Sequence, residues 1–172
     1  MDGIKVIDDV LSKADFQALH DVMYNSTFPW YYTQYKVKPY NSNDHDDQFN
    51  SQLGHGFYSK GLPTSDYFNI VEPILNYLKP ECIIRIKANL TLATQEIAKH
   101  ALHKDFNYNE SLTAIFYVNT NNGYTYFEGT EETIPSKENR LVIFPSYLIH
   151  AGTTCSDTKN RCVININYFI NK

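Results

Sequence analysis

The spacing of apolar positions changes near residue 80 and divides the chain into two patterns. Early in the first part, Phe16, Leu19 and Met23 recur at helical spacing within SKADFQALHDVMYN, residues 12–25. Ser12 stands at the start of this segment with an acidic residue three positions later, which is a helix-start signal. The segment therefore predicts an amphipathic helix.

A second helix is predicted at about residues 65–79, with Pro73 either bending it or setting where it begins. Between the two helices, NSNDHDDQFNSQLGHG at residues 41–56 is polar, acidic and glycine-bearing, and it predicts a long loop. Long loops in small domains are often lids or binding loops, so this one is a candidate substrate lid.

After residue 80 the pattern changes to short runs rich in Ile, Val, Thr, Tyr and Phe, which suit a half-buried sheet surface. The runs are CIIRIKANLTLA, SLTAIFYVN, YTYFEG, NRLVIFP and CVININYF. An Asn-Gly pair within residues 119–124 predicts a tight turn between two of them. We expect one domain over residues 1–172, mainly β, with a helical part at about 1–80 packed outside a sandwich or barrel at about 81–172.

Composition narrows the class of protein. The 172 residues are 42% hydrophobic and 20% charged, as in a globular domain. A net charge of −4 without a basic cluster disfavours a nucleic-acid binder. Three cysteines without CxxC spacing fit reduced thiols, and no run reaches the roughly 18 apolar residues of a membrane span. We therefore expect a cytoplasmic protein, in the host cytoplasm if it is viral, without a membrane or nucleic-acid partner.

The chemistry concentrates around His103 and Asp105. Residues two apart on an extended strand point to the same face, so this imidazole and this carboxylate could meet at one metal ion. A second match to the same spacing, His45 with Asp47, lies in the acidic loop without strand signals beside it. Context therefore favours His103 and Asp105 over His45 and Asp47.

A further histidine and an arginine extend this set. His150 stands at the end of the run NRLVIFPSYLIH, where a rigid strand could aim it at the same ion. Two histidines and one carboxylate are typical of non-haem Fe(II) oxygenases, whereas zinc prefers four ligands or three plus water. Arg161 begins a strand in which Arg161, Val163, Asn165 and Asn167 share one face. A buried guanidinium there would favour a carboxylate-bearing ligand.

Three further histidines, His20, His55 and His100, are not assigned to the metal site. His100 stands three residues before His103, which suits helical rather than strand geometry, so we expect it at the surface. His20, in the first predicted helix, and His55, in the loop, are expected to be solvent-facing or locally hydrogen-bonded.

The second half of the chain, from RIKANL at residue 85, resembles the 2-oxoglutarate- and Fe(II)-dependent dioxygenases, in particular the prolyl 4-hydroxylase-like branch that includes small bacteriophage oxygenases. The resemblance consists of the HxD at His103 and Asp105, the TAIFYVN strand, the G-x-T-x-F of Gly123, Thr125 and Phe127, the NRLVIFP strand before His150, and an H-x10-R that ends at Arg161. The order and spacing of these elements together form the signal.

The resemblance implies a double-stranded β-helix, or jelly roll, in which His103, Asp105 and His150 bind Fe(II) and Arg161 binds the distal carboxylate of 2-oxoglutarate. It also suggests Tyr117 as a hydroxyl partner for that carboxylate. Asn89 takes the place of a tyrosine directed at the other end of the cosubstrate, and this is a departure from the animal prolyl hydroxylases.

The implied activity is hydroxylation of a peptidyl or free amino acid, or another small molecule, with O2 consumed and succinate and CO2 released. Ascorbate is a further candidate cofactor. Two alternatives stay open: a noncatalytic jelly-roll binding or assembly module, and a cupin-like metal enzyme that does not use 2-oxoglutarate. The substrate and the oligomeric state do not follow from the sequence.

Overall fold

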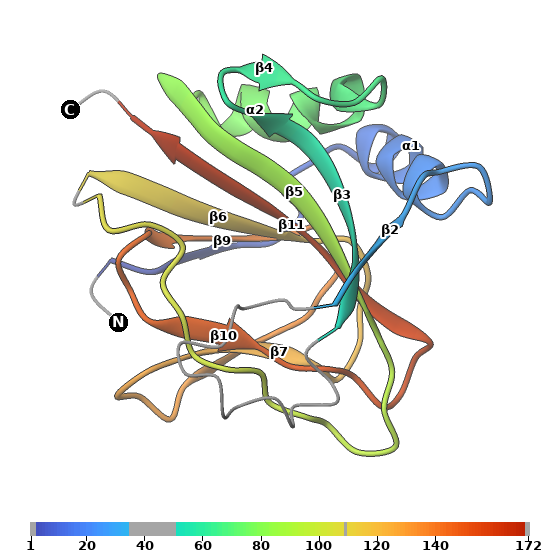
Figure 1. Cartoon of the computed structure of the whole chain (residues 1–172), viewed down its shortest axis with the longest axis vertical. Helices are drawn as coiled ribbons and strands as arrows, with labels where there is room; N and C mark the ends of the chain where they lie inside the picture. The colour runs from blue at the N-terminus through green and yellow to red at the C-terminus, as the bar shows by residue number, and fades with distance from the viewer. Residues whose placement is uncertain (1–2, 35–50, 109, 171–172) are drawn as a thin grey trace.

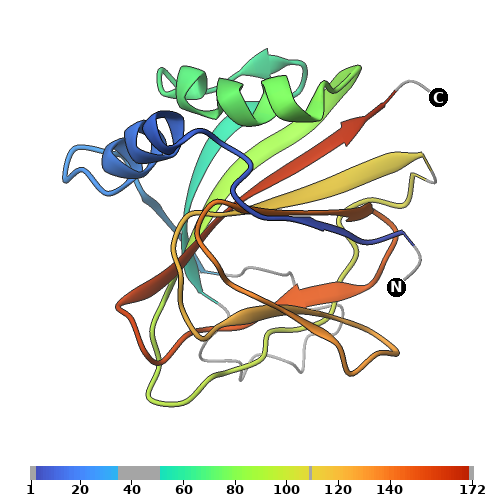
Figure 2. The same cartoon turned by 180° about the vertical axis from the view of Figure 1, so that it is seen from behind.

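The structure, a computed structural model, describes residues 3–34, 51–108 and 110–170. Two antiparallel sheets face each other, and two short helices cover the outer face of the larger sheet, as Figures 1 and 2 show. No helix among the described residues is long and apolar enough to cross a membrane.

The larger sheet has eight strands, in the order β1-β9-β6-β11-β5-β3-β2 with β4 paired to β3. Their bounds are β1 Lys5–Ile7, β2 Tyr31–Thr33, β3 Gln52–Ser59, β4 Leu62–Pro63, β5 Cys82–Leu92, β6 Ser111–Tyr117, β9 Arg140–Pro145 and β11 Asn160–Phe169. The smaller sheet has the order β10-β7-β8, with β7 at Tyr124–Phe127, β8 at Thr133–Pro135 and β10 at His150–Gly152.

Both helices lie where the apolar spacing predicts helical structure. Helix α1 spans Lys13–Met23, and the Ser12 hydroxyl caps it by accepting a 3.1 Å hydrogen bond from the Asp15 backbone N–H. The second segment is a 3-10 helix at Phe68–Val71 followed by α2 at Glu72–Leu78. A proline stands in the first turn of α2, so it sets where the helix begins rather than bending it.

The two faces of the larger sheet have different chemistry because strand side chains alternate. On β11, Cys162, Ile164, Ile166 and Tyr168 pack with the helices in the main hydrophobic core. The residues between them face the smaller sheet. A second apolar cluster lies between the two sheets and comprises Ile115, Tyr117, Phe127, Val142, Phe144 and Val163. The larger sheet thus separates the apolar core beneath the helices from a face that can carry polar groups.

The expected helical part at residues 1–80 is wrong in one respect, because this region also supplies strands β1 to β4. β3 pairs along β5, and β1 pairs with β9. The predicted loop at 41–56 is corrected at residues 52–56, which belong to β3: Gly54 and Gly56 lower the strand signal, but pairing with β5 satisfies their backbone. Residues 41–50 of that loop, and with them the lid hypothesis and His45, lie outside the described residues.

Asn139 ties the N-terminal segment to the sheet. Its side chain accepts a 2.9 Å hydrogen bond from the Leu11 N–H and donates a 2.9 Å hydrogen bond to the Leu11 carbonyl. It has a positive φ of 56°, a conformation that asparagine tolerates better than most residues.

We therefore expect Asn139→Ala to lower the free energy of unfolding by about 2 kcal/mol, because two buried backbone groups lose their partners. Urea denaturation measures this change. Asn76→Ala, at an exposed position on α2, is the matched control and should change stability by less than about 0.5 kcal/mol. Equal effects of the two substitutions would contradict the assigned role of Asn139.

Candidate metal and cofactor site

Backbone pairing brings His103 and His150 together. Each backbone N–H donates to the carbonyl of the other residue at 3.0 Å, although 47 positions separate them in the sequence. The two imidazole rings consequently lie on the same side, with centroids 4.8 Å apart. Because β10 begins at His150, the second histidine is carried by the smaller sheet.

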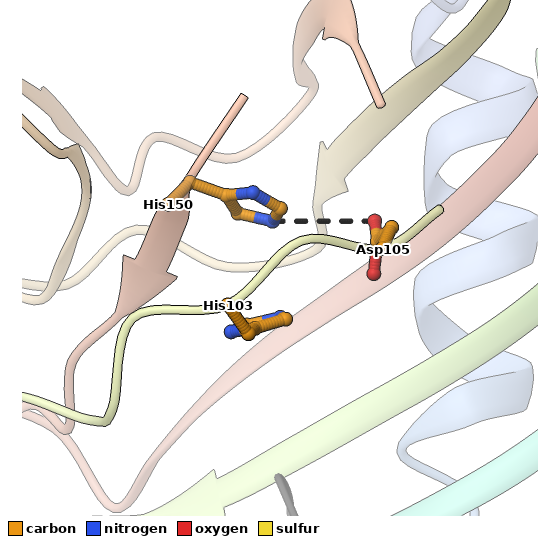
Figure 3. A group of neighbouring side chains, drawn as sticks. All are labelled: His103, Asp105 and His150. Carbon is orange, nitrogen blue, oxygen red and sulfur yellow. Dashed lines mark ion pairs between the residues drawn. The ribbon is translucent and has the colours of Figure 1, made fainter. Parts of the chain in front are cut away.

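Asp105 completes a group of three ligand-type side chains with His103 and His150, shown in Figure 3. One ligand atom from each lies within 4.8 Å of the others, and His150 Nε2 is 4.0 Å from Asp105 Oδ2. Each histidine Nδ1 faces a backbone carbonyl, at 3.2 Å for His103 and 3.0 Å for His150. Because a carbonyl only accepts, each contact favours the tautomer of a neutral imidazole that has its proton on Nδ1 and a lone pair on Nε2 for a metal.

Three side chains on the larger sheet orient the Asp105 carboxylate. Arg85 Nη2 donates to Oδ1 at 3.2 Å, and Thr113 Oγ1 and Asn167 Nδ2 each donate to Oδ2 at 3.0 Å. Burial alone would raise the pKa of Asp105, but the charge of His150 when that imidazole is protonated and the permanent charge of Arg85 lower it below its ordinary value. The carboxylate is therefore ionised and fixed in direction, as a metal ligand must be.

His150 has the complementary protonation state. It is only 2% exposed, and burial lowers its pKa below the ordinary value despite the opposing effect of Asp105. A neutral imidazole is the form that binds metals. Two imidazole nitrogens and one carboxylate therefore make a donor set that fits a divalent ion such as Fe(II).

Arg161 lies buried, 5% exposed, in a setting of neutral partners. Its Nε donates to Ser136 Oγ at 2.8 Å, and its Nη2 donates to Thr125 Oγ1 at 3.0 Å. Among the described residues no carboxylate lies within ion-pair distance of it. Gly152 gives the guanidinium room, because a Cβ at that position would be 3.0 Å from Nη1. A buried cation without a counter-charge favours an anionic ligand.

Tyr117 and Asn89, the two further predicted cosubstrate residues, have different settings. Tyr117 is fully buried, its hydroxyl donates to Thr125 Oγ1 at 2.7 Å, and the guanidinium carbon of Arg161 lies 5.5 Å from its ring centroid. It therefore orients Thr125 beside Arg161. Asn89 borders a cavity, and its buried Oδ1 has no hydrogen-bond partner among the described residues.

That cavity has a volume of about 290 Å³ and connects the three metal-ligand candidates with the buried guanidinium. Its lining includes His103, Asp105, His150 and Arg161 together, with Ile115 and Val163 as apolar wall. One small molecule inside it could therefore reach both the three ligand side chains and the buried guanidinium.

Three of these site residues were missed from the sequence, Arg85, Thr113 and Ser136, and Thr125 was named in a motif without a role beside Arg161. The first two could have been found from strand alternation, since Arg85 shares a face with Asn89 on β5 and Thr113 shares one with Tyr117 on β6. Ser136 lies just after a strand and carries no such signal.

One expectation about the histidines was wrong, and for His55 one of two alternatives is excluded. His100 is buried, at 8% exposed, rather than on the surface, because its N–H donates to Gly152 and its carbonyl accepts from the Tyr126 hydroxyl. His55 is hydrogen-bonded rather than solvent-facing. It is 3% exposed, and its ring nitrogens lie 2.8 Å from the Pro29 carbonyl and 2.7 Å from Ser65 Oγ.

Neither a model of a known protein family nor a curated protein matches this sequence. Solved structures do match its fold. The non-haem α-ketoglutarate-dependent epimerase SnoN from nogalamycin biosynthesis has a TM-score of 0.65 at 13% identity, over 98% of this chain and 78% of that chain. A prolyl hydroxylase from Trichoplax adhaerens, in complex with a peptide fragment of hypoxia inducible factor, has 0.64 at 12%, over 98% and 84%. A Pseudomonas putida prolyl-4-hydroxylase has 0.58 at 13%, over 98% and 93%.

The first neighbour depends on α-ketoglutarate, which is another name for 2-oxoglutarate, and the other two are prolyl hydroxylases; at such low identity the likeness shows the fold alone. The mainly β architecture with two facing antiparallel sheets is thus of the same jelly-roll type as these three enzymes. The comparisons give no link to bacteriophages, so that part of the resemblance stays a prediction.

The orientation of Asp105 by Thr113 is testable. Thr113→Val keeps the side-chain shape but removes the hydroxyl donor, so we expect the affinity for Fe(II) or Co(II) to fall about tenfold to a hundredfold. Competition with a metal chelator measures this affinity. Thr133→Val, at an exposed position on β8, should leave it unchanged. Unchanged affinity in Thr113→Val would mean that this hydrogen bond does not support metal binding.

Proposed function

We propose that this protein is an Fe(II)- and 2-oxoglutarate-dependent dioxygenase that hydroxylates a small molecule or a peptidyl or free amino acid. The observation that carries the proposal is that His103, Asp105 and His150 lie in one cavity with Arg161, a buried guanidinium without a carboxylate partner among the described residues. The jelly-roll fold is compatible with this chemistry but does not establish it.

His103, Asp105 and His150 would bind the iron through two Nε2 atoms and one carboxylate oxygen. With Fe(II), 2-oxoglutarate and O2 bound, the chemistry supplied is oxidative decarboxylation: one oxygen atom enters succinate, CO2 leaves, and the other oxygen atom enters a substrate C–H bond. The hydrogen bonds from Arg85, Thr113 and Asn167 hold the carboxylate ligand in one orientation throughout.

Arg161 would bind the distal carboxylate of 2-oxoglutarate through paired charge-assisted hydrogen bonds. Thr125 and Ser136 fix its guanidinium, and Tyr117 fixes Thr125 in turn. In this arrangement Tyr117 acts on the cosubstrate through Thr125. Asn89 would offer its amide N–H group to an oxygen of 2-oxoglutarate, which has only acceptor atoms.

The apolar wall of Ile115 and Val163, together with aromatic rings packed beside His150, would keep water from the reacting groups. The Phe144 ring packs edge-on against His150 with centroids 4.7 Å apart, and Phe127 packs against Phe144 at 5.0 Å. A dry surrounding strengthens the electrostatic contacts of Asp105 and Arg161 and limits side reactions. Ascorbate and O2 enter the proposal as accompanying small molecules, and neither nucleic acid nor membrane is part of it.

The two alternatives leave specific features unexplained. A noncatalytic jelly-roll module has no need of a carboxylate oriented by three donors between two imidazoles with free Nε2 atoms. A cupin-like metal enzyme without 2-oxoglutarate would not account for Arg161, whose burial without a counter-charge is unfavourable unless an anion binds.

The decisive measurement is the weak visible charge-transfer band that forms when Fe(II) and 2-oxoglutarate are added without oxygen, followed by succinate release when oxygen is admitted. We expect both for the native protein. Asp105→Ala should abolish the band, and Arg161→Met should weaken 2-oxoglutarate binding about tenfold or more while iron still binds.

Arg140→Met is the matched control, because Arg140 pairs with the exposed Asp8 away from the cavity. It should leave the band and the affinity for 2-oxoglutarate at native values. No band with the native protein, or equal loss of iron and 2-oxoglutarate in Arg161→Met, would remove the proposal.

A further inference from the structure

A second cation, Lys87, lies on the cavity face of β5 between Arg85 and Asn89. It is half-buried, and among the described residues no carboxylate lies within ion-pair distance of it. Burial lowers the pKa of Lys87, and the neighbouring charge of Arg85 lowers it further. The ammonium is therefore in an unfavourable setting that an anion would relieve.

The pairing of charges around the cavity distinguishes Lys87 from the other cationic side chains. The lining contains four cationic side chains, Arg85, Lys87, Lys104 and Arg161, and one carboxylate, Asp105. Arg85 pairs with that carboxylate at 3.2 Å, Arg161 is assigned to 2-oxoglutarate, and Lys104 is exposed to water. Lys87 is thus the half-buried cation among the lining residues that neither the protein nor the proposed cosubstrate neutralises.

The neighbouring strand leaves space for the Lys87 side chain. On β3, Gly54 and Gly56 face this part of β5, and Gly56 is the direct partner of Lys87. A Cβ at Gly54 would lie 2.8 Å from Lys87 Cε and 3.4 Å from Nζ. The lysine side chain therefore extends across Gly54, and a Cβ at that position would displace its terminal atoms.

Asn165 lies directly opposite Lys87 in the register of β11 and β5. Its Oδ1 is buried, borders the cavity and has no hydrogen-bond donor among the described residues. A buried acceptor without a donor is unfavourable, so this position favours a ligand with an N–H or O–H group. Directly opposite residues have Cβ atoms about 5 Å apart, a spacing that adjacent groups of one small molecule can bridge.

We propose that Lys87 and Asn165 bind a free α-amino acid as the substrate, with its carboxylate at Lys87 Nζ and its α-amino group donating to Asn165 Oδ1. The inference rests on the proposed function and names the substrate class of the same site. A residue inside a peptide has no main-chain carboxylate, so its backbone would leave Lys87 without a counter-charge even if its amide N–H donated to Asn165 Oδ1. Because Arg85, the neighbour of Lys87 on this face, contacts Asp105, the bound amino acid would lie beside the metal ligands.

The test compares common L-α-amino acids with their α-carboxamides and N-acetyl derivatives. Calorimetric titration without oxygen into protein loaded with Fe(II) and 2-oxoglutarate reads binding independently of turnover. Succinate release and a product mass gain of one oxygen read turnover. We expect at least one amino acid to bind and to stimulate succinate release, and its amide and N-acetyl forms to bind about tenfold or more weakly.

Two variants locate the contact. Lys87→Met should remove the preference for acid over amide. Gly54→Ala, which keeps the charge but displaces the lysine, should reduce that preference even if Lys87→Met fails to fold. Lys13→Met, on the first turn of α1 at the opposite face of the sheet, is the matched control and should keep the native preference.

The outcomes separate the two proposals. Absence of the charge-transfer band in the native protein would defeat the proposed function itself. A normal band with acids and amides binding alike, with binding of no amino acid, or with nucleoside monophosphates or internal peptides as the preferred ligands would overturn the amino-acid assignment alone.

Discussion

The alternation of side chains across β5, β11 and β6 is the constraint on which the rest of the structure depends. Each of these central strands gives one set of residues to the core beneath the helices and the other set to the space between the sheets. The apolar set supplies the burial that stabilises the sheet, so the opposite set is free to be polar. A shift of one residue in register would exchange the two faces, and the packing of the helical layer opposes such a shift.

Charge pairing then distinguishes the polar groups on that inner face. Asp105 receives three hydrogen bonds, including one from Arg85, and needs no further partner to stay ionised. Arg161 instead faces neutral groups, and Lys87 has another cation, Arg85, as its charged neighbour. Buried or half-buried cations of this kind are costly in a free protein and favourable once anions bind. The inner face is therefore better suited to anionic ligands than the net charge of −4 suggests.

The sequence predicted the helix at 12–25, the strands after residue 80 and the residues that supply the candidate ligands, because each depends on local periodicity or on residue type. It failed for β3 and for His100. β3 contains two glycines and weak strand signals, yet pairing with β5 stabilises it. His100 was expected at the surface, but its backbone N–H donates to the Gly152 carbonyl and its carbonyl accepts from the Tyr126 hydroxyl. These hydrogen bonds hold its segment against the smaller sheet. Pairing between distant segments outweighed local preference in both cases.

By itself, the sequence determined the element types along most of the chain and a short set of candidate residues for binding a metal and a carboxylate. Only the tertiary structure decided that His103 and His150 exchange backbone hydrogen bonds. It also decided that Arg85 donates to Asp105. Lys87, in contrast, lies beside glycines of β3 and opposite the Asn165 amide rather than a carboxylate. The physical reason is that these contacts depend on strand order and register between segments far apart in the chain. Residue type and local spacing indicate which ligands a side chain can bind, whereas strand order and register determine which groups it contacts in the folded protein.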